Sequence, residues 1–168
     1  MDSELERVLA AVHGDRPVIL IDGRSGSGKT ELATDLAVSL DASLVRLDDV
    51  YPGWDGIEEA SRRVLGDILL ADRWHRWDWS VNAAAEWHDI DPSRALIVEG
   101  SGALSRANRA LATLGVWVQL DDVTRKARAL ARDGAMYEPH WEAWAAQEQR
   151  FFDRERPDLL ADLVVRGA

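Results

Sequence analysis

The segment from Gly23 to Thr30, GRSGSGKT, constrains the fold of this chain more than any other feature. It matches the P-loop pattern, in which a glycine is followed by four residues and then by Gly-Lys-Thr or Gly-Lys-Ser. An apolar run, PVILID, precedes the motif, and a helical pattern, ELATDLAVSL, follows it. In this strand–loop–helix context, backbone N–H groups curl around phosphate oxygens at a helix N-terminus. We therefore expect a nucleoside triphosphate site here.

The motif residues have separate roles at such a site. Lys29 can reach the β- and γ-phosphates and stabilise charge there, and Thr30 can ligate Mg²⁺. The motif predicts a bound nucleotide but does not choose among motors, GTPases, ABC proteins and small kinases. We assign the ATP cradle to Gly23, Ser25, Gly26, Ser27, Gly28, Lys29 and Thr30.

The apolar runs of the chain indicate the fold around this motif. They are short, rich in β-branched residues and not alternating, as expected for strands buried on both faces. They cover residues 17–22, 95–100, 115–120 and 161–167, with a weaker run at 42–47. Helical patterns lie between them at 28–40, 57–73, 105–114, 122–133 and 139–154. This alternation predicts an α/β P-loop NTPase fold, with a parallel, doubly wound sheet of about five strands and helices on both faces. At 168 residues the chain suits a single domain, 1–168.

Composition narrows the classes of partner. The formal net charge is -10, which argues against a nonspecific nucleic-acid binder because phosphates require a basic face. The chain has no Cys, so thiol catalysis and Cys-ligated zinc are excluded. The N-terminal residues lack the apolar core of a signal peptide, and no apolar run reaches the roughly 20 residues that span a bilayer. We expect a cytoplasmic protein with a small-molecule acceptor and with no nucleic-acid or membrane partner. The sequence does not indicate an oligomeric state.

Acidic residues follow two of the expected strands. Asp48 and Asp49 come after SLVRL, and Glu99 ends the run ALIVE. Because the carboxyl ends of parallel strands line the ligand crevice, these carboxylates should lie beside the P-loop. One of the Asp pair, with Asp48 preferred, can accept a proton from a substrate hydroxyl, while Asp49 and Glu99 can join Thr30 in holding Mg²⁺. Tyr51 opens the turn YPGWDG, which would begin a substrate-facing loop.

Three arginines recur at spacings of three and four after the strand GVWVQL. Arg125, Arg128 and Arg132 would therefore share one face of a helix. Placed at the carboxyl end of a strand, such a face can close over the triphosphate as a lid and neutralise charge on the transferred phosphoryl group.

These pieces, in this order, resemble the uridine kinase-like branch of P-loop small-molecule kinases, to which phosphoribulokinase and bacterial pantothenate kinase are related. The resemblance rests on IDGRSGSGKT, LDDVY, RWDW, LIVEG and the arginine lid. It implies that Asp48 is the general base and that Thr30 and Glu99 form the Mg²⁺ site. It also implies that Asp78, in RWDW, binds sugar hydroxyls, with Trp79 beside it. The pattern DDVYPGWDG with RWDW and WH is similar to uncharacterised kinase-like proteins, so the resemblance indicates a reaction type more closely than a substrate.

We therefore expect an ATP- and Mg²⁺-dependent kinase that phosphorylates a hydroxyl of a nucleoside or a similar polyhydroxylated metabolite. Two alternatives stay open. A nucleoside monophosphate or shikimate-type kinase would use extra arginines for an anionic acceptor, for example Arg62, Arg63, Arg73 and Arg76. A nucleotide-binding regulatory protein would bind ATP with little turnover. The Trp-rich stretch 74–87 could form either a pocket or part of the core.

Overall fold

A five-stranded parallel sheet lies at the centre of the computed structural model, which describes residues 3–168. Its strands run in the order β2-β5-β1-β6-β7, so the P-loop strand β1 is in the middle. Glu99 on β5 and Val116 on β6 are both in register with Ile21. The strands are β1 (Val18–Asp22), β2 (Ser43–Arg46), β5 (Leu96–Glu99), β6 (Leu114–Gln119) and β7 (Leu163–Arg166).

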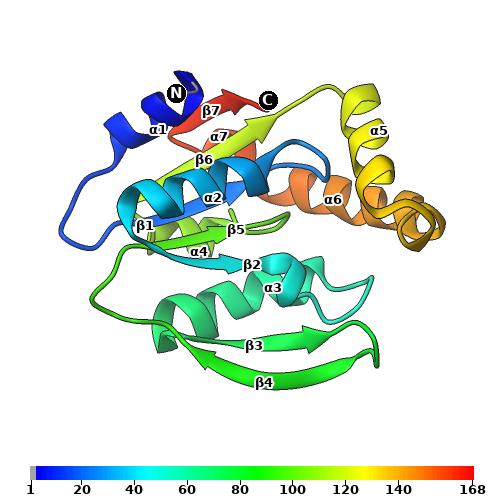
Figure 1. Ribbon diagram of the computed structural model, residues 1–168, viewed down its shortest axis with the longest axis horizontal. Helices are drawn as coiled ribbons and strands as arrows, with labels where there is room; N and C mark the ends of the chain where they lie inside the picture. The colour runs from blue at the N-terminus through cyan, green and yellow to red at the C-terminus, as the bar shows by residue number, and fades with distance from the viewer. Residues whose placement is uncertain (1–2) are drawn as a thin grey trace.

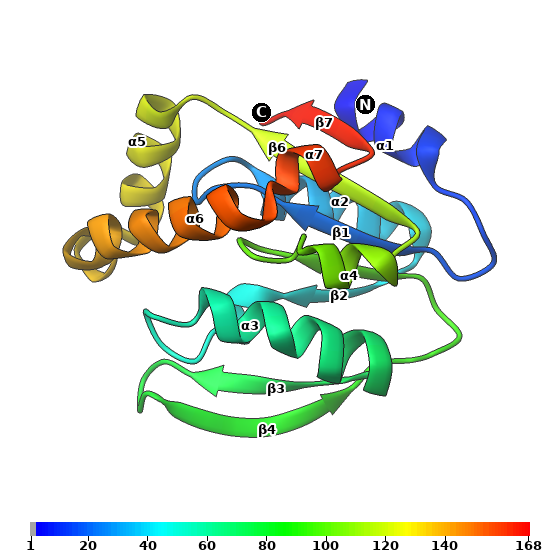
Figure 2. The same ribbon diagram turned by 180° about the vertical axis from the view of Figure 1, so that it is seen from behind.

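Helices cover both faces of this sheet, as Figures 1 and 2 show from opposite sides. Ile19 and Ile21 pack with one core cluster, whereas Leu20 between them packs with the other. This alternation explains why β1 is apolar at every position. The predicted α/β fold is confirmed. On one face lie α1 (Ser3–Ala11) and α2 (Lys29–Leu40), and on the other lie α3 (Ile57–Arg63), α4 (Arg106–Ala110), α6 (Trp141–Glu155) and α7 (Pro157–Leu160).

Helix α5 (Asp122–Asp133) stands beyond the carboxyl ends of the strands, where the arrowheads of Figure 1 point. Asp121 caps its N-terminus by accepting a 2.9 Å hydrogen bond from the backbone N–H of Thr124. Two 3-10 turns, Gly134–Met136 and Glu138–His140, then lead into α6. The segment from α5 to α6 thus forms one wall at the edge of the sheet that carries the P-loop.

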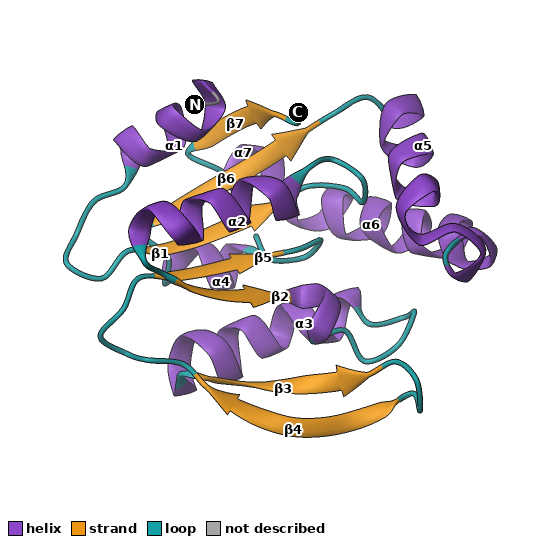
Figure 3. Cartoon of the chain, viewed as in Figure 1, coloured by secondary structure: helices purple, strands orange, loops and turns teal. Residues whose placement is uncertain are grey.

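The Trp-rich stretch forms an antiparallel hairpin of β3 (Arg73–Asp78) and β4 (Ala83–Asp89), which the sequence did not predict. It forms a separate two-stranded sheet beside α3, as Figure 3 shows. Aromatic stacking holds the strands together: the rings of Trp74 and His88, and those of His75 and Trp87, are 4.4 Å apart. The register shifts between His75 and Trp77, so regular alternation is lost there.

Other boundaries also differ from expectation. The helix expected over 57–73 is α3 followed by a π-helix, Val64–Leu69, and the helix expected over 105–114 is the shorter α4. Helices α1 and α7 were not expected; α1 buries only Leu5 and Val8 among charged neighbours, which makes a weak pattern. No helix within residues 3–168 combines the length and apolarity needed to cross a membrane.

Candidate active site

The P-loop joins β1 to α2 and places the helix N-terminus at the carboxyl edge of the sheet. Gly28 is the N-cap of α2, with φ 99°, and no side chain caps the helix. The free N–H groups of the first turn can therefore serve an anion. Lys29, the first helical residue, is buried, and its Nζ donates a 3.1 Å hydrogen bond to the carbonyl of Arg24 across the loop. Loop and lysine thus fit a polyphosphate.

Gly26 allows α5 to approach the loop closely. Its φ is 80°, and a Cβ on this residue would lie 2.1 Å from the carbonyl oxygen of Arg125. Only glycine fits this combination of conformation and space. The P-loop is therefore packed against the N-terminal half of α5.

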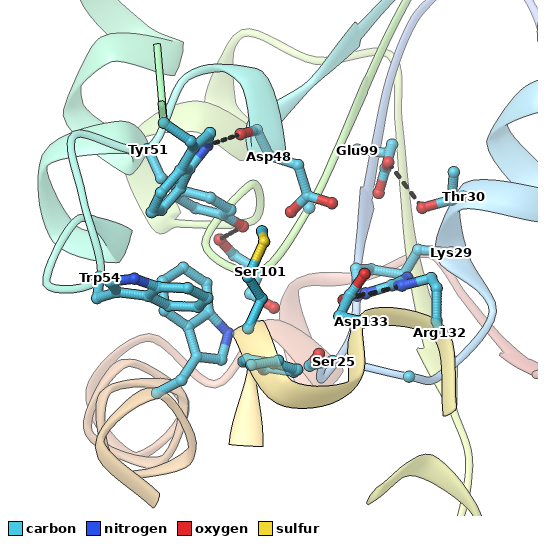
Figure 4. A pocket seen from close by; sticks show the side chains of 16 residues that line it. Ser25, Lys29, Thr30, Asp48, Tyr51, Trp54, Glu99, Ser101, Arg132 and Asp133 are labelled. Carbon is cyan, nitrogen blue, oxygen red and sulfur yellow. Dashed lines mark hydrogen bonds and ion pairs between the residues drawn. The ribbon is translucent and has the colours of Figure 1, made fainter. Parts of the chain in front are cut away.

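Thr30 and Glu99 meet on neighbouring elements, as Figure 4 shows. The hydroxyl of Thr30 donates a 2.9 Å hydrogen bond to Oε1 of Glu99, whose residue is only 2% exposed. Burial raises the pKa of Glu99, and the nearby charge of Lys29 opposes that shift. Mg²⁺ prefers hard oxygen ligands and takes only one or two from the protein, with phosphates and water supplying the rest. The hydroxyl–carboxylate pair therefore fits a magnesium site, held by Thr30 directly and by Glu99 directly or through water.

A cavity of about 180 Å³ extends from this pair. One end consists of P-loop residues and the other of aromatic rings, with the carboxylates of Asp48 and Glu99 between them, as Figure 4 shows. Its lining residues are Ser25, Gly26, Lys29, Thr30, Asp48, Tyr51, Trp54, Trp79, Glu99, Gly100, Ser101, Arg132, Asp133, Met136, Tyr137 and Trp144.

The aromatic end of the cavity is built around Trp54. Its ring lies 5.0 Å from that of Trp79, 5.6 Å from Tyr137 and 6.1 Å from Trp144, measured between centroids. His140 stacks on Trp54 at 4.1 Å. These rings come from four separate segments, namely the loop after β2, the hairpin turn after β3, the α5–α6 connection and α6 itself. They form a rigid apolar wall opposite the phosphate cradle.

Tyr51 closes the floor of this wall. It is buried, and its hydroxyl donates a 2.8 Å hydrogen bond to the carbonyl of Ser101. Burial raises the pKa of Tyr51 well above its ordinary value, so the phenol stays protonated near neutral pH. Tyr51 can therefore shape the cavity, but it cannot act as a base there.

The two adjacent aspartates are placed differently. Both residues are exposed, but only Asp48 lines the cavity, with its carboxylate pointing inward. Both belong to the 3-10 turn Leu47–Asp49 that follows β2. The geometry thus favours Asp48 over Asp49 for contact with a substrate. Among residues 3–168, no cluster of three or more His, Cys, Asp or Glu side chains has the spacing of a metal site.

The three arginines of α5 have different surroundings. Arg125 is 5% exposed and lies outside the cavity, where its Nη1 donates to the carbonyl of Ser25 at 3.1 Å. Arg128 pairs with Glu31 at 3.1 Å, and it shares with Arg132 a second pocket that the P-loop residues Gly28, Lys29 and Thr30 also line. Only Arg132 lines the cavity, beside Asp133, with which it forms a 2.8 Å ion pair. A helical spacing predicts which residues share a face of the helix, but it does not predict which turn of that face is buried.

Asp78 lies outside the cavity. Its Oδ1 accepts hydrogen bonds from the backbone N–H of Ser80 at 2.9 Å and from the Ser80 hydroxyl at 2.5 Å. These bonds lower the pKa of Asp78. They tie its carboxylate to the hairpin turn and not to the cavity. Trp79, the next residue, does line the cavity.

Several lining residues carried no clear signal in the sequence. Asp133 follows the arginine series, and Ser101 follows the Glu99-Gly100 strand end. Trp54 lies in the turn after Tyr51, and Trp144 has the spacing of an ordinary packing residue. What they share is a position after the carboxyl end of β2 or β5, or at and beyond the C-terminal end of α5.

Comparison with solved structures shows the same fold in kinase-like proteins. A "Possible Uridine Kinase" from Bacillus stearothermophilus superposes with a TM-score of 0.65 and 18% identity, covering 96% of this chain and 94% of that one. A "putative fructose transport system kinase" from Silicibacter sp. TM1040 gives a TM-score of 0.56 and 19% identity, with 97% of each chain covered. An uncharacterized protein from Eubacterium ventriosum gives 0.53 and 12%, covering 89% of this chain and 87% of that one. No protein-family model matches the sequence, and no curated protein sequence matches it significantly.

The likeness to these structures agrees with the resemblance to the uridine kinase-like branch that the motifs indicated. The chain has the P-loop kinase fold. At these identities the comparison concerns the fold alone, and the chemistry has to be argued from the residues of the cavity.

Proposed function

We propose that this chain is an ATP- and Mg²⁺-dependent kinase that transfers the γ-phosphoryl group to a hydroxyl of a small acceptor held against the aromatic wall. The observation that carries the proposal is the arrangement of one cavity: phosphate cradle, hydroxyl–carboxylate pair, inward carboxylate and aromatic wall follow one another. An acceptor seated on the rings would present its hydroxyl to Asp48, between the wall and the P-loop.

The residues of the chain supply positioning and charge. Lys29 and the N-terminus of α2 bind the phosphates, and Arg132 neutralises charge at the transferred group. Asp48 accepts the hydroxyl proton or a hydrogen bond from the acceptor, which orients the attacking oxygen. Thr30 and Glu99 would hold Mg²⁺, which would supply positive charge beside the phosphates and so reduce their repulsion towards the acceptor.

The acceptor we favour is a nucleoside or a similar polyhydroxylated molecule, because flat rings recognise a planar or sugar face. The arginines that would serve an anionic acceptor are engaged elsewhere. Arg62 and Arg63 pair with Glu59, and Arg76 pairs with Glu86. Arg73 lies 4.4 Å from the ring centroid of Trp87, and none of the four lines the cavity. This arrangement disfavours a nucleoside monophosphate or shikimate-type kinase.

The test is ADP release with ATP and Mg²⁺ against a panel of nucleosides, sugars, pantothenate, nucleoside monophosphates and shikimate. Asp48→Asn and Asp49→Asn are assayed in parallel. We expect one uncharged acceptor to stimulate turnover, and we expect Asp48→Asn to lose on the order of a hundredfold or more. A larger loss in Asp49→Asn would exchange the two roles. Slow ADP release that is equal in all three proteins would favour the nucleotide-binding regulator instead.

A further inference from the structure

The backbone of Ser25, in the P-loop, is held through both its N–H and its C=O by buried charged side chains. Its backbone N–H donates a 2.8 Å hydrogen bond to Oε2 of Glu148 on α6. Its carbonyl oxygen accepts the 3.1 Å bond from Arg125 on α5. Glu148 is only 6% exposed and Arg125 only 5%. Neither side chain lines the cavity, so the two act on the loop from behind.

Glu148 also reaches the acceptor side of the cavity through Ser101. The hydroxyl of Ser101 lies 2.7 Å from the same Oε2 atom of Glu148, and the Ser101 carbonyl accepts the hydroxyl of Tyr51. The hydroxyl oxygen of Ser101 is also 3.1 Å from the carbonyl oxygen of Gly23. A continuous set of hydrogen bonds therefore joins the aromatic wall, the loop after β5, the P-loop and α5.

The side chain of Glu148 is held in place by its surroundings. Burial raises the pKa of Glu148, and the charges of Lys29 and Arg125 oppose that shift. Both hydrogen bonds converge on one oxygen, so the side chain has a single orientation that satisfies them. Without this acceptor the buried N–H of Ser25 would lose its partner, which costs free energy.

We propose that Glu148 is a positioning residue, which orients the Ser25 peptide and thereby sets the curve of the P-loop around the phosphate chain. The effects that this inference predicts on kcat and KM rest on the proposed kinase function. The effects that it predicts on MgATP affinity and on the Ser25 amide signal do not depend on the transfer of a phosphoryl group.

The experiment compares Glu148→Gln and Glu148→Ala with the wild-type protein, with Glu142→Gln as the matched control. Glu142 is on the same helix, is 87% exposed at its side chain and pairs loosely with Lys126 at 3.6 Å. A glutamine oxygen placed at the Oε2 position can still accept from both Ser25 and Ser101, whereas alanine removes the acceptor. Three quantities are measured: the Kd of MgATP by calorimetry, kcat and KM with the stimulating acceptor, and the Ser25 amide signal by NMR.

We expect Glu148→Ala to weaken MgATP binding and to lower kcat/KM by roughly tenfold to a hundredfold, because a small misplacement of a catalytic loop has an effect of this size. Glu148→Gln should recover both to within about fivefold of wild type, since it exchanges a charged acceptor for a neutral one. The Ser25 amide proton should move upfield and exchange faster in the alanine variant only. Glu142→Gln should match wild type throughout.

Two results would overturn the proposal: an alanine variant that binds MgATP as tightly as wild type, or a glutamine variant as impaired as the alanine one. The second would mean that charge, and not the orientation of the peptide, matters. If Glu148→Ala does not fold, the glutamine variant and its Ser25 amide signal decide. If no acceptor stimulates even the wild type, the kinase proposal fails, while the MgATP affinities and the amide signal still decide this one.

Discussion

The indole Nε1 of Trp79 lies 2.8 Å from the backbone carbonyl oxygen of Asp48 and donates a hydrogen bond to it. This bond joins the end of the hairpin strand β3 to the 3-10 turn that carries the proposed base. The hairpin therefore supplies a ring to the aromatic wall and also holds the turn of Asp48 in place.

Replacing Trp79 with phenylalanine keeps an aromatic ring but removes the donor. The lost bond is worth about 1 kcal/mol, so we expect kcat to fall about fivefold to tenfold with the KM for ATP unchanged. Steady-state kinetics with ATP and the stimulating acceptor measure this. Trp87→Phe is the control, because Trp87 is 45% exposed and stacks on His75 within the hairpin. Equal losses in both variants would show that the hairpin matters only as a whole.

We expect substitution of Arg125 to affect mainly stability and substitution of Arg132 to affect mainly catalysis. Arg125 is buried, bonds the Ser25 carbonyl and pairs with Asp122 at 2.6 Å, so Arg125→Ala should lower the free energy of unfolding by about 1–3 kcal/mol. Arg132 is about half exposed at its side chain, so Arg132→Ala should leave the Tm unchanged. It should lower kcat by about a hundredfold, because it removes charge stabilisation at the transferred group. Thermal denaturation and steady-state kinetics of both variants test these predictions. A large fall in the Tm of Arg132→Ala would contradict a catalytic role for Arg132.

The magnesium requirement should depend on the pair of Thr30 and Glu99. Thr30→Val and Glu99→Gln should each raise the Mg²⁺ concentration needed for half-maximal activity by about tenfold to a hundredfold. Thr34 lies one turn further along α2 and its hydroxyl donates to the carbonyl of Thr30, so Thr34→Val tests for effects of a lost hydroxyl away from the site. A titration with Mg²⁺ at fixed ATP measures all three. If Thr34→Val shifts the requirement as much as Thr30→Val, the metal assignment is wrong.

Stability should depend on pH through Asp22, at the end of β1. Its carboxylate is buried and accepts hydrogen bonds from the backbone N–H groups of Gly23, Gly102 and Leu104. Burial nevertheless raises its pKa from 3.8 to about 7, against the effect of these bonds and of Lys29. Between these two values the folded state holds a proton at Asp22 that the unfolded state has lost. The contribution of Asp22 to stability is therefore full below pH 4 and decreases as the pH rises towards 7.

The raised pKa sets an upper bound of about 4 kcal/mol for this decrease. Denaturant unfolding of wild type and Asp22→Asn between pH 4 and 8 isolates it. The asparagine variant has no proton to lose, so the free-energy difference between the two proteins should shift in favour of the variant as the pH rises. A difference that is constant with pH would show that Asp22 does not titrate in this range.

The parts of the molecule that the sequence predicted are those in which a local pattern determines the structure. The central strands β1, β5 and β6 are buried on both faces and are apolar runs in the sequence, and the P-loop needs glycines at fixed positions. The hairpin carried no such pattern, because both strands are partly exposed and the register shift after His75 interrupts their alternation.

The site was predictable where a strand end fixes a residue, and not where packing between distant segments fixes it. Asp48 and Glu99 follow β2 and β5, and both line the cavity. Arg125 and Asp78 had suitable spacing or neighbours, but burial beneath the P-loop and the turn with Ser80 hold them elsewhere. Glu148 belongs to α6, 123 residues after its partner Ser25, and a helical pattern cannot report such a contact.

The aromatic wall is assembled from segments that contribute no strand to the main sheet, namely the turn after β2, the hairpin, the α5–α6 connection and α6. The proposed phosphate site lies at β1, α2 and the end of β5, at the carboxyl edge of the main sheet. Under the proposed function, different parts of one small chain therefore serve acceptor choice and phosphate chemistry. Natural variation or laboratory evolution could exchange the rings around Trp54 for a new substrate while the phosphate-handling half remained as it is.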